Sequence, residues 1–287
     1  MGLLAISILP VAVLGTFIYN RDKNKESVKL LIKLFLAGLL STFLSMFITV
    51  FLGLFFPIFV TESSNLDLFE LFFYAFFGVA LVEEFSKWIM VYKISYNHEE
   101  FDEVYDAIVY TTFVSLGFAC FENILYVLDG GIVTGIVRAI FAVPGHACDG
   151  VLMGYFLGFA KVYQRQNDQR RSKINLALSL VVPVISHGIY DYCAMSYNSE
   201  LIFLFFVFVG IMFIHCFKTV KQISKEEIII NNQLVQNNNY QPVSQQMVQN
   251  NNYQPVNQQN VSQNNFCPNC GTKVESIYCP KCGRKNM

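Results

Sequence analysis

The stretch that decides the fold is residues 71–92, LFFYAFFGVALVEEFSKWIMVY, in which two adjacent glutamates lie inside a run apolar enough to cross a membrane. The twelve residues before Glu83 and Glu84 carry no charge. A carboxylate in hydrocarbon is costly unless it is paired or has a function. Two neighbouring carboxylates cannot both ionise cheaply. The pair therefore indicates a functional site within a transmembrane helix.

The whole chain has the composition of an all-α polytopic membrane protein. Of its 287 residues 54% are hydrophobic and 14% are charged, whereas soluble domains carry about 25% charged residues. Apolar runs of about twenty residues predict seven transmembrane helices, at 2–19, 34–60, 68–92, 106–128, 132–160, 174–195 and 201–217. Pro57 and Pro144 are expected to break or kink the two longest runs, so the count lies between six and eight. The net charge of −1 carries no information about nucleic acid, and no nucleic-acid partner is expected.

The distribution of basic residues predicts the orientation. Lys and Arg concentrate in the loops 20–33, 161–173 and 218–225, and the turns 61–67, 129–134 and 196–200 contain none. Basic loops face the cytoplasm, so we expect the N-terminus outside and the C-terminus in the cytoplasm of a prokaryotic cell. The first apolar run lacks a basic n-region and a small-residue cleavage site, which indicates a retained anchor.

The composition changes sharply after the last predicted span. Residues 231–265 are dominated by Asn and Gln, and the segment VQNNNYQPV occurs at 235–243 and again at 248–256. Such a segment has too few apolar residues to bury a core. We therefore expect a membrane domain at 1–225 followed by a disordered linker at 226–265.

The last segment, 266–287, contains two Cys-x-x-Cys pairs, each followed by glycine. This spacing is typical of a zinc ribbon, and four thiolates complete a tetrahedral site with no open position. A disulfide is disfavoured in the reducing cytoplasm. The predicted zinc is therefore structural, and the ribbon is expected to bind a protein partner. Its ligands would be Cys267, Cys270, Cys279 and Cys282.

Further ionisable residues fall within other apolar runs, namely Glu122, His146, Asp149, His187 and Asp191. Four groups on four spans, Glu83, Glu122, His146 and His187, lie within about 6 Å of the middle of their spans at about 1.5 Å per residue. They could therefore meet in one layer. Taken singly, each also has a structural interpretation, such as an ion pair, a hydrogen bond to a neighbouring span or a bond to a backbone carbonyl.

Helical spacing predicts local pairs. Glu83 and Lys87 are four residues apart and can pair. Since Glu84 faces about 100° away around the helix, one of the two carboxylates would remain free for proton transfer; the sequence leaves open which one. His187 and Asp191 share the same spacing, so the carboxylate can orient the imidazole. Arg138 lies nearer the outer face and is expected to snorkel or to line an entrance.

The motifs together resemble those of the PrsW family of intramembrane proteases, which is related to the CAAX-processing and bacteriocin-immunity superfamily. They are Glu83-Glu84-x-x-Lys87, Phe118-x-x-x-Glu122, Pro144-Gly145-His146 followed by Gly154-Tyr155, and His187-x-x-x-Asp191. Single motifs of this kind are weak, but four in order on successive spans are specific. The resemblance covers roughly residues 68–195 and excludes the first two spans, the linker and the ribbon.

The resemblance implies an endopeptidase that cleaves membrane-associated proteins, such as an anti-sigma factor. Glu83 or Glu84 would activate water, His187 with Asp191 would bind or polarise the carbonyl group, and Glu122 and His146 would position the water. The CAAX branch has histidine where this chain has Glu122, so its roles do not transfer directly.

The family has also been regarded as metal-dependent, and two histidines with several carboxylates could hold one zinc. No His-Glu-x-x-His motif is present, however, and a glutamate-activated water needs only a suitable pKa. The metal-free mechanism is therefore preferred.

Two other classes of function remain open from the sequence. Intramembrane Glu and His residues are also typical of transporters and proton relays, although the spans show no internal repeat. A non-catalytic membrane adaptor that displays the zinc ribbon is the other alternative. Under every hypothesis the chain is expected to contact the lipid bilayer. The protease hypothesis also requires a membrane-protein substrate.

Overall fold

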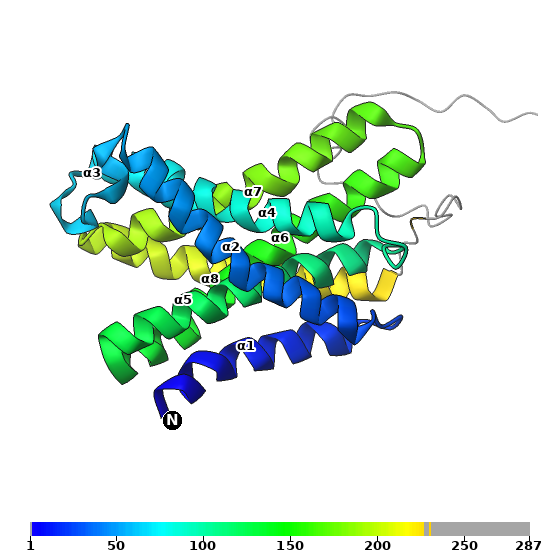
Figure 1. Ribbon diagram of the computed structural model, residues 1–287, viewed down its shortest axis with the longest axis horizontal. Helices are drawn as coiled ribbons and strands as arrows, with labels where there is room; N and C mark the ends of the chain where they lie inside the picture. The colour runs from blue at the N-terminus through cyan, green and yellow to red at the C-terminus, as the bar shows by residue number, and fades with distance from the viewer. Residues whose placement is uncertain (1, 227–229, 231–287) are drawn as a thin grey trace, which may run out of the picture. The chain divides into compact units, whose positions relative to one another are not determined.

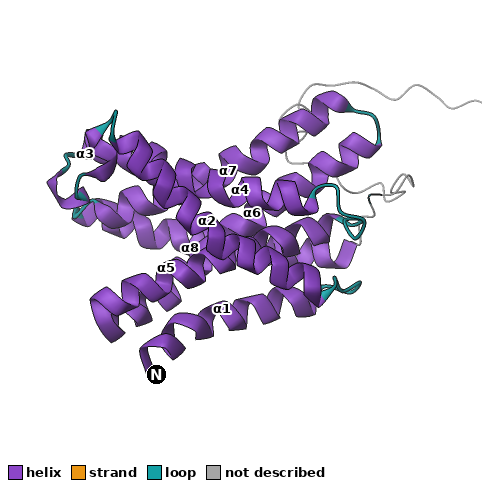
Figure 2. Ribbon diagram, in the orientation of Figure 1, coloured by secondary structure: helices purple, strands orange, loops and turns teal. Residues whose placement is uncertain are grey.

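The computed structural model describes residues 2–226 and residue 230, and within these residues the protein is helical, without strands (Figure 2). The predicted linker and zinc ribbon, with their four cysteines, lie outside the described residues apart from residue 226 and residue 230. The long helices are α1 (Gly2–Arg21), α2 (Val28–Gly53), α5 (Val104–Ile140), α6 (Ala142–Arg165), α7 (Gln169–Met195) and α8 (Ser199–Glu226). Two short 3₁₀ turns, η1 (Pro57–Val60) and η2 (Ser63–Asn65), follow α2.

The glutamate pair lies in a composite helical run. It comprises α3 (Leu68–Phe73), the π-helical segment η3 (Tyr74–Ala80) and α4 (Leu81–Ser95). Asp67 begins the run with a capping box, because its side chain accepts the amide hydrogen of Glu70 while Glu70 bonds back to the amide of Asp67. Short π-helical segments occur frequently at functional sites, and this one ends three residues before Glu83.

Five helical stretches of the described residues are long and apolar enough to cross a membrane. They are Gly2–Arg21, Val28–Gly53, Val104–Arg165, Gln169–Met195 and Ser199–Glu226. The third stretch contains both α5 and α6. These helices agree with a multi-pass membrane protein, and the count of seven spans stays a prediction.

Both predicted interruptions are present, and each falls a few residues before its proline. Helix α2 ends at Gly53, four residues before Pro57, which instead begins η1. Pro144 lies in the first turn of α6, where proline is tolerated, and the break between α5 and α6 falls at Phe141. Helix α5 also continues to Ile140 through a kink at Gly131, whose φ of 73° suits glycine.

Helix α5 is the centre of the bundle. It packs against α1, α2 and α6, and Figure 1 shows α1, α2 and α5 side by side. Nearly every residue of its first half is buried. Helices α2 and α5 approach closely at Gly38 and Gly117, where a Cβ on either glycine would collide with a carbonyl oxygen of the other helix. Small residues permit such contacts between membrane helices.

The glycine of the predicted Gly154-Tyr155 motif has the same role on the other side of α5. A Cβ at Gly154 would meet backbone atoms of Ala107 and Ile108. This contact lets α6 lie against α5, so that His146 and Glu122, from the two helices, can reach each other. The motif glycine is therefore explained by helix packing.

Replacing Gly117 with alanine should destabilise the bundle by about 1–3 kcal/mol, because the added methyl group collides with backbone that cannot move aside. The matched control is Gly210→Ala in α8, where no atom lies within 4 Å of the added Cβ; alanine should be neutral or slightly stabilising there. Thermal unfolding in detergent would measure both. Equal melting temperatures for the two variants would contradict the close contact.

Candidate active site

The predicted site residues converge on one cavity of about 410 Å³ inside the bundle. Its walls come from α2, η3, α4, α5, α6 and α7. The ionisable residues that line it are Glu83, Glu122, Arg138, His146, Asp149, His187 and Asp191. Of the six candidate residues, only Glu84 does not line this cavity. The ionisable residues that were predicted to share a depth on four spans therefore also lie around one cavity.

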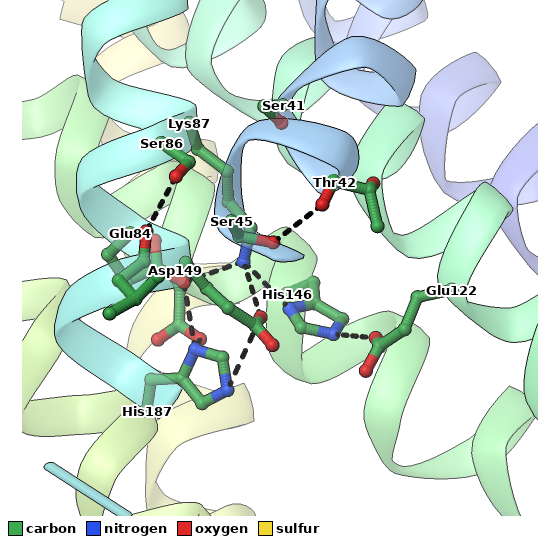
Figure 3. A network of polar contacts seen from close by, with 12 residues as sticks. Ser41, Thr42, Ser45, Glu84, Ser86, Lys87, Glu122, His146, Asp149 and His187 are labelled. Atoms are coloured by element: carbon green, nitrogen blue, oxygen red, sulfur yellow. Dashed lines mark hydrogen bonds and ion pairs between the residues drawn. The ribbon is translucent and has the colours of Figure 1, made fainter. Parts of the chain in front are cut away.

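The Lys87 ammonium lies at the centre of the polar network (Figure 3). Its Nζ is 2.7 Å from Glu84 Oε1, 3.4 Å from Glu83 Oε2 and 3.2 Å from His146 Nδ1. It also lies 4.0 Å from the centre of the Phe118 ring, a distance typical of a cation–π contact. The Lys87 side chain is completely buried. A single cation therefore joins residues of three of the predicted motifs.

Lys87 contacts both glutamates, so its predicted pair with Glu83 is present but is not exclusive. The shortest contact of Lys87 is with Glu84, whose side chain is completely buried, and not with Glu83. Positions three and four residues before a helical residue both lie on its side of the helix, and the long lysine side chain reaches both. Glu83 is 15% exposed and lines the cavity. The glutamate that is open to the cavity is therefore Glu83.

His187 is surrounded by carboxylates. Its Nδ1–H donates to Glu84 Oε1 at 2.8 Å, and its Nε2 lies 3.3 Å from Asp191 Oδ2 and 3.9 Å from Glu83 Oε2. Asp149 Oδ2 is 4.0 Å from Nδ1. Asp191 thus lies within ion-pair distance of the imidazole, although its Oδ2 accepts no hydrogen bond within the described residues, and Glu84 holds the other side of the ring.

His146 connects Lys87 to Glu122. A lysine ammonium can only donate, so Nδ1 of His146 accepts from Lys87 and its Nε2–H donates to Glu122 Oε2 at 2.8 Å. Arg138, expected near an entrance, lines the cavity and donates to Glu122 at 2.8 Å and to Asn123 at 3.0 Å. Side chains, rather than a backbone carbonyl, therefore fix the imidazole of His146.

Several residues of the cavity were not among the predicted candidates. Asp149 is 4% exposed, and its Oδ1 has no hydrogen-bond partner within the described residues. Its position one turn after His146 was the available signal. Tyr74, Tyr126 and Tyr190 also line the cavity. The first two predicted spans lay outside the resemblance, yet α2 contributes Thr42, Ser45 and Thr49 to the wall.

Four groups could in principle hold a metal ion. One donor atom each of Glu84, His146, Asp149 and His187 lie within 4.8 Å of one another. Imidazole and carboxylate donors suit zinc. However, the Lys87 ammonium already bonds Glu84 and His146, and a second cation among the same donors would be repelled by it. With Lys87 in this position, the donor set does not fit a metal.

Comparison with known proteins agrees with these motifs. A family model described as "PrsW family intramembrane metalloprotease" matches residues 26–216, about two thirds of the chain. This chain belongs to the PrsW family. The match includes every helix that lines the cavity, and therefore extends the resemblance to α2. No solved structure matches the chain significantly.

Individual relatives carry the same family name. Protease PrsW of Oceanobacillus iheyensis is 37% identical over 236 residues, which are 80% of this chain and 100% of that protein. Protease PrsW of Geobacillus kaustophilus is 45% identical over 122 residues, 42% of this chain and 52% of that protein. Protease PrsW of Bacillus subtilis is 42% identical over 133 residues, 46% of this chain and 59% of that protein.

Replacing Lys87 with methionine should destabilise the fold by about 3–5 kcal/mol, because it leaves the buried Glu84 without its cation. The control is Lys93→Met on the same helix, where the lysine is exposed and the effect should be within about 0.5 kcal/mol. Melting temperature and yield of the purified proteins are the measurements. A Lys87→Met protein as stable as the Lys93→Met protein would show that the ammonium does not hold the site together.

Proposed function

We propose that this chain is an intramembrane endopeptidase that hydrolyses peptide bonds of membrane-associated proteins with a water molecule activated by Glu83. The observation that carries the proposal is a cavity within the helices at which a partly exposed carboxylate, Glu83, faces His187 Nε2 across 3.9 Å. That separation is longer than a direct hydrogen bond, and both groups are open to the same space. The family membership and the name Protease PrsW of its relatives support a proteolytic reaction.

Glu83 is assigned as the general base because it is the member of the glutamate pair that lines the cavity. Its carboxylate takes a proton from water while the water oxygen attacks the carbonyl carbon of the peptide. The same proton then passes to the departing amine nitrogen, so the carboxylate is regenerated. A positioned acid–base group of this kind contributes about 10²–10⁴-fold to a rate.

Glu84 is assigned as a positioning residue. Its Oε1 accepts hydrogen bonds from Lys87 at 2.7 Å and from His187 at 2.8 Å. It therefore fixes both the cation beside Glu83 and the imidazole opposite Glu83. These two contacts give the buried carboxylate a role that does not require access to the substrate.

We assign His187 the role of donating a hydrogen bond to the carbonyl oxygen of the substrate. In its imidazolium form the Nδ1–H is donated to Glu84, and the Nε2–H, beside Asp191, lies 3.9 Å from Glu83 Oε2 at the wall of the cavity. A carbonyl oxygen bonded to Nε2–H would place its carbon next to the activated water. Donors aimed at the developing oxyanion are worth several kcal/mol in such sites.

We assign Glu122 and His146 a positioning role: they maintain the geometry and the charge balance of the site. Glu122 accepts from Arg138 and from His146, so the position that is histidine in the CAAX branch here carries a neutralised carboxylate. His146 in turn bonds the lysine that contacts Glu83. Through these contacts the pair holds the environment of the general base.

The proposed substrates are membrane proteins of the anti-sigma-factor class. The distribution of basic loops supports a C-terminus in the cytoplasm. The zinc ribbon, with structural zinc on Cys267, Cys270, Cys279 and Cys282, would recruit a protein partner from that side. The transporter and adaptor alternatives are less well supported, because the curated relatives are named proteases.

Substituting Glu83 with glutamine should reduce cleavage of a co-expressed single-span substrate at least 100-fold, because the amide cannot accept the proton of water. Membrane levels and melting temperature should stay close to those of the parent protein. Glu84→Gln should lose activity together with stability, because Lys87 and His187 lose their shared carboxylate. Fragment analysis on gels and thermal unfolding would measure both effects.

Glu62→Gln serves as the matched control, since Glu62 is an exposed glutamate whose side chain does not cap η2. This variant should cleave and melt like the parent protein. Full cleavage by Glu83→Gln would eliminate Glu83 as the base. If Glu84→Gln alone abolished cleavage without loss of stability, the roles of the two glutamates would have to be exchanged.

The metal-free mechanism predicts the metal content of the protein. Full-length chain in which Cys267, Cys270, Cys279 and Cys282 are replaced by serine should contain much less than one zinc per chain. It should retain cleavage after treatment with a chelator. Elemental analysis and the fragment assay are the measurements.

One zinc per chain in the protein with these four cysteines replaced, lost in a further His187→Ala variant, would overturn the metal-free proposal. Inactivation by the chelator with recovery on adding zinc would do the same. Either result would require Lys87 to leave its position among the donors, since its ammonium contacts Glu84 and His146 there.

A further inference from the structure

A second group of buried acidic side chains lies where the loop between α1 and α2 meets the start of α5. Asp22 and Glu26 belong to that loop, and Asp106 belongs to the first turn of α5. Glu122 of the active site lies sixteen residues further along α5, which corresponds to about 24 Å of helix. The second acidic cluster, defined as Asp22, Glu26 and Asp106, is therefore separate from the active site.

The three carboxylates of the second acidic cluster converge. One oxygen of each lies within 4.8 Å of the others. The exposed fractions of Asp22, Glu26 and Asp106 are 4%, 6% and 1%. Like charges this close and this deeply buried repel one another strongly unless protons or a cation neutralise them.

Several oxygens of the cluster lack partners although the side chains are held firmly. Oδ2 of Asp106 accepts the backbone amides of Asp102 at 3.0 Å and Glu103 at 2.6 Å, while Oδ1 has no hydrogen-bond partner within the described residues. Glu26 accepts a short hydrogen bond from the Tyr110 hydroxyl. Neither oxygen of Asp22 has a hydrogen-bond partner among the described residues. Buried polar atoms without partners are rare, and an ion is one recognised explanation.

Within the described residues, Lys25 of the same loop donates its hydrogen bonds to backbone carbonyl oxygens rather than to a carboxylate of the cluster. Nζ of Lys25 donates to the carbonyl oxygens of Tyr19 at 2.7 Å and Asp22 at 3.3 Å. Without a cation, these three buried carboxyl groups could avoid mutual repulsion only by taking up protons.

We propose that Asp22, Glu26 and Asp106 bind one divalent cation of the class that prefers oxygen ligands, namely Ca²⁺, Mg²⁺ or Mn²⁺. All three donors are carboxylates, which suit Ca²⁺, Mg²⁺ and Mn²⁺ better than zinc. Two oxygens on opposite sides of one Ca²⁺ are about 4.6–5.2 Å apart, and on Mg²⁺ about 4.0–4.2 Å. Three donor oxygens that all lie within 4.8 Å of one another are close enough to contact one ion of this class.

The bound cation would tie together three segments that lie outside the active site. It would join the α1–α2 loop to the start of α5, and thereby to the loop that precedes α5. The amide of the buried residue Ile230, which follows α8, donates to the carbonyl oxygen of Asp102 in that preceding loop. The proposed cation site is therefore next to the loop that Ile230, beyond α8, contacts through its backbone amide.

The test uses the full-length protein in detergent, stripped with EDTA and then titrated separately with Ca²⁺, Mg²⁺ and Mn²⁺. Calorimetry should show one saturable site per chain, and the melting temperature should rise by several degrees with the cation that binds. Asp22→Asn should weaken binding at least tenfold, because it removes one charged ligand. Asp129→Asn, at an exposed aspartate on α5, is the matched control and should bind like the parent protein.

The order of melting temperatures gives a second readout that does not depend on proteolysis. In EDTA at pH 8, Asp22→Asn should melt above the parent protein, because a buried uncompensated charge has been removed. In saturating cation the order should reverse. An inactive Glu83→Gln protein should bind the cation normally, so failure of the proposed proteolysis would leave this result unchanged.

Absence of saturable binding of all three ions would overturn the proposal, and so would binding that Asp22→Asn leaves unchanged. A parent protein that melts at the same temperature in EDTA and in each cation would also overturn it, because the cluster would then be neutralised by protons alone. Glu26→Gln provides an independent second variant, since it retains a group that can accept from the Tyr110 hydroxyl. It should weaken binding in the same direction as Asp22→Asn.

Discussion

The buried ammonium of Lys87 is the interaction on which the rest of the site depends. An ion at this depth is tolerated only when charged and polar partners surround it. Glu84 and Glu83 supply the negative charge from α4, His146 supplies an acceptor from α6, and the Phe118 ring covers it from α5. Satisfying one cation therefore fixes the relative positions of three helices, and the same contacts leave Glu83 at the wall of the cavity.

Close helix packing makes this arrangement possible. Contacts through Gly38 and Gly117 bring α2 against α5, and the contact at Gly154 brings α6 against α5. At such separations the side chain of Glu122 reaches His146 directly, and hydroxyl groups of α2 line the cavity. Small residues in the helix interfaces thus determine which polar groups can meet, although these residues carry no chemistry themselves.

The two groups of buried acidic residues in the described chain differ in how their negative charge is balanced. Around the active site, the protein provides its own cation in Lys87, and Arg138 neutralises Glu122. In the cluster of Asp22, Glu26 and Asp106, several carboxylate oxygens have no partner within the described residues. The first arrangement argues against an added metal among its donors, whereas the second favours one.

The sequence by itself determined the helical membrane class, the family motifs and the shared depth of the ionisable residues, because hydrophobic run length and helical spacing are local properties. Only the tertiary structure decided that Lys87 pairs most closely with Glu84, that Asp149 joins the cavity and that the chain breaks at Phe141 rather than at Pro144. Helical periodicity indicates which residues lie on the same face of one helix. Which faces then meet depends on contacts between helices, such as those at Gly117 and Gly154, that no single helix encodes.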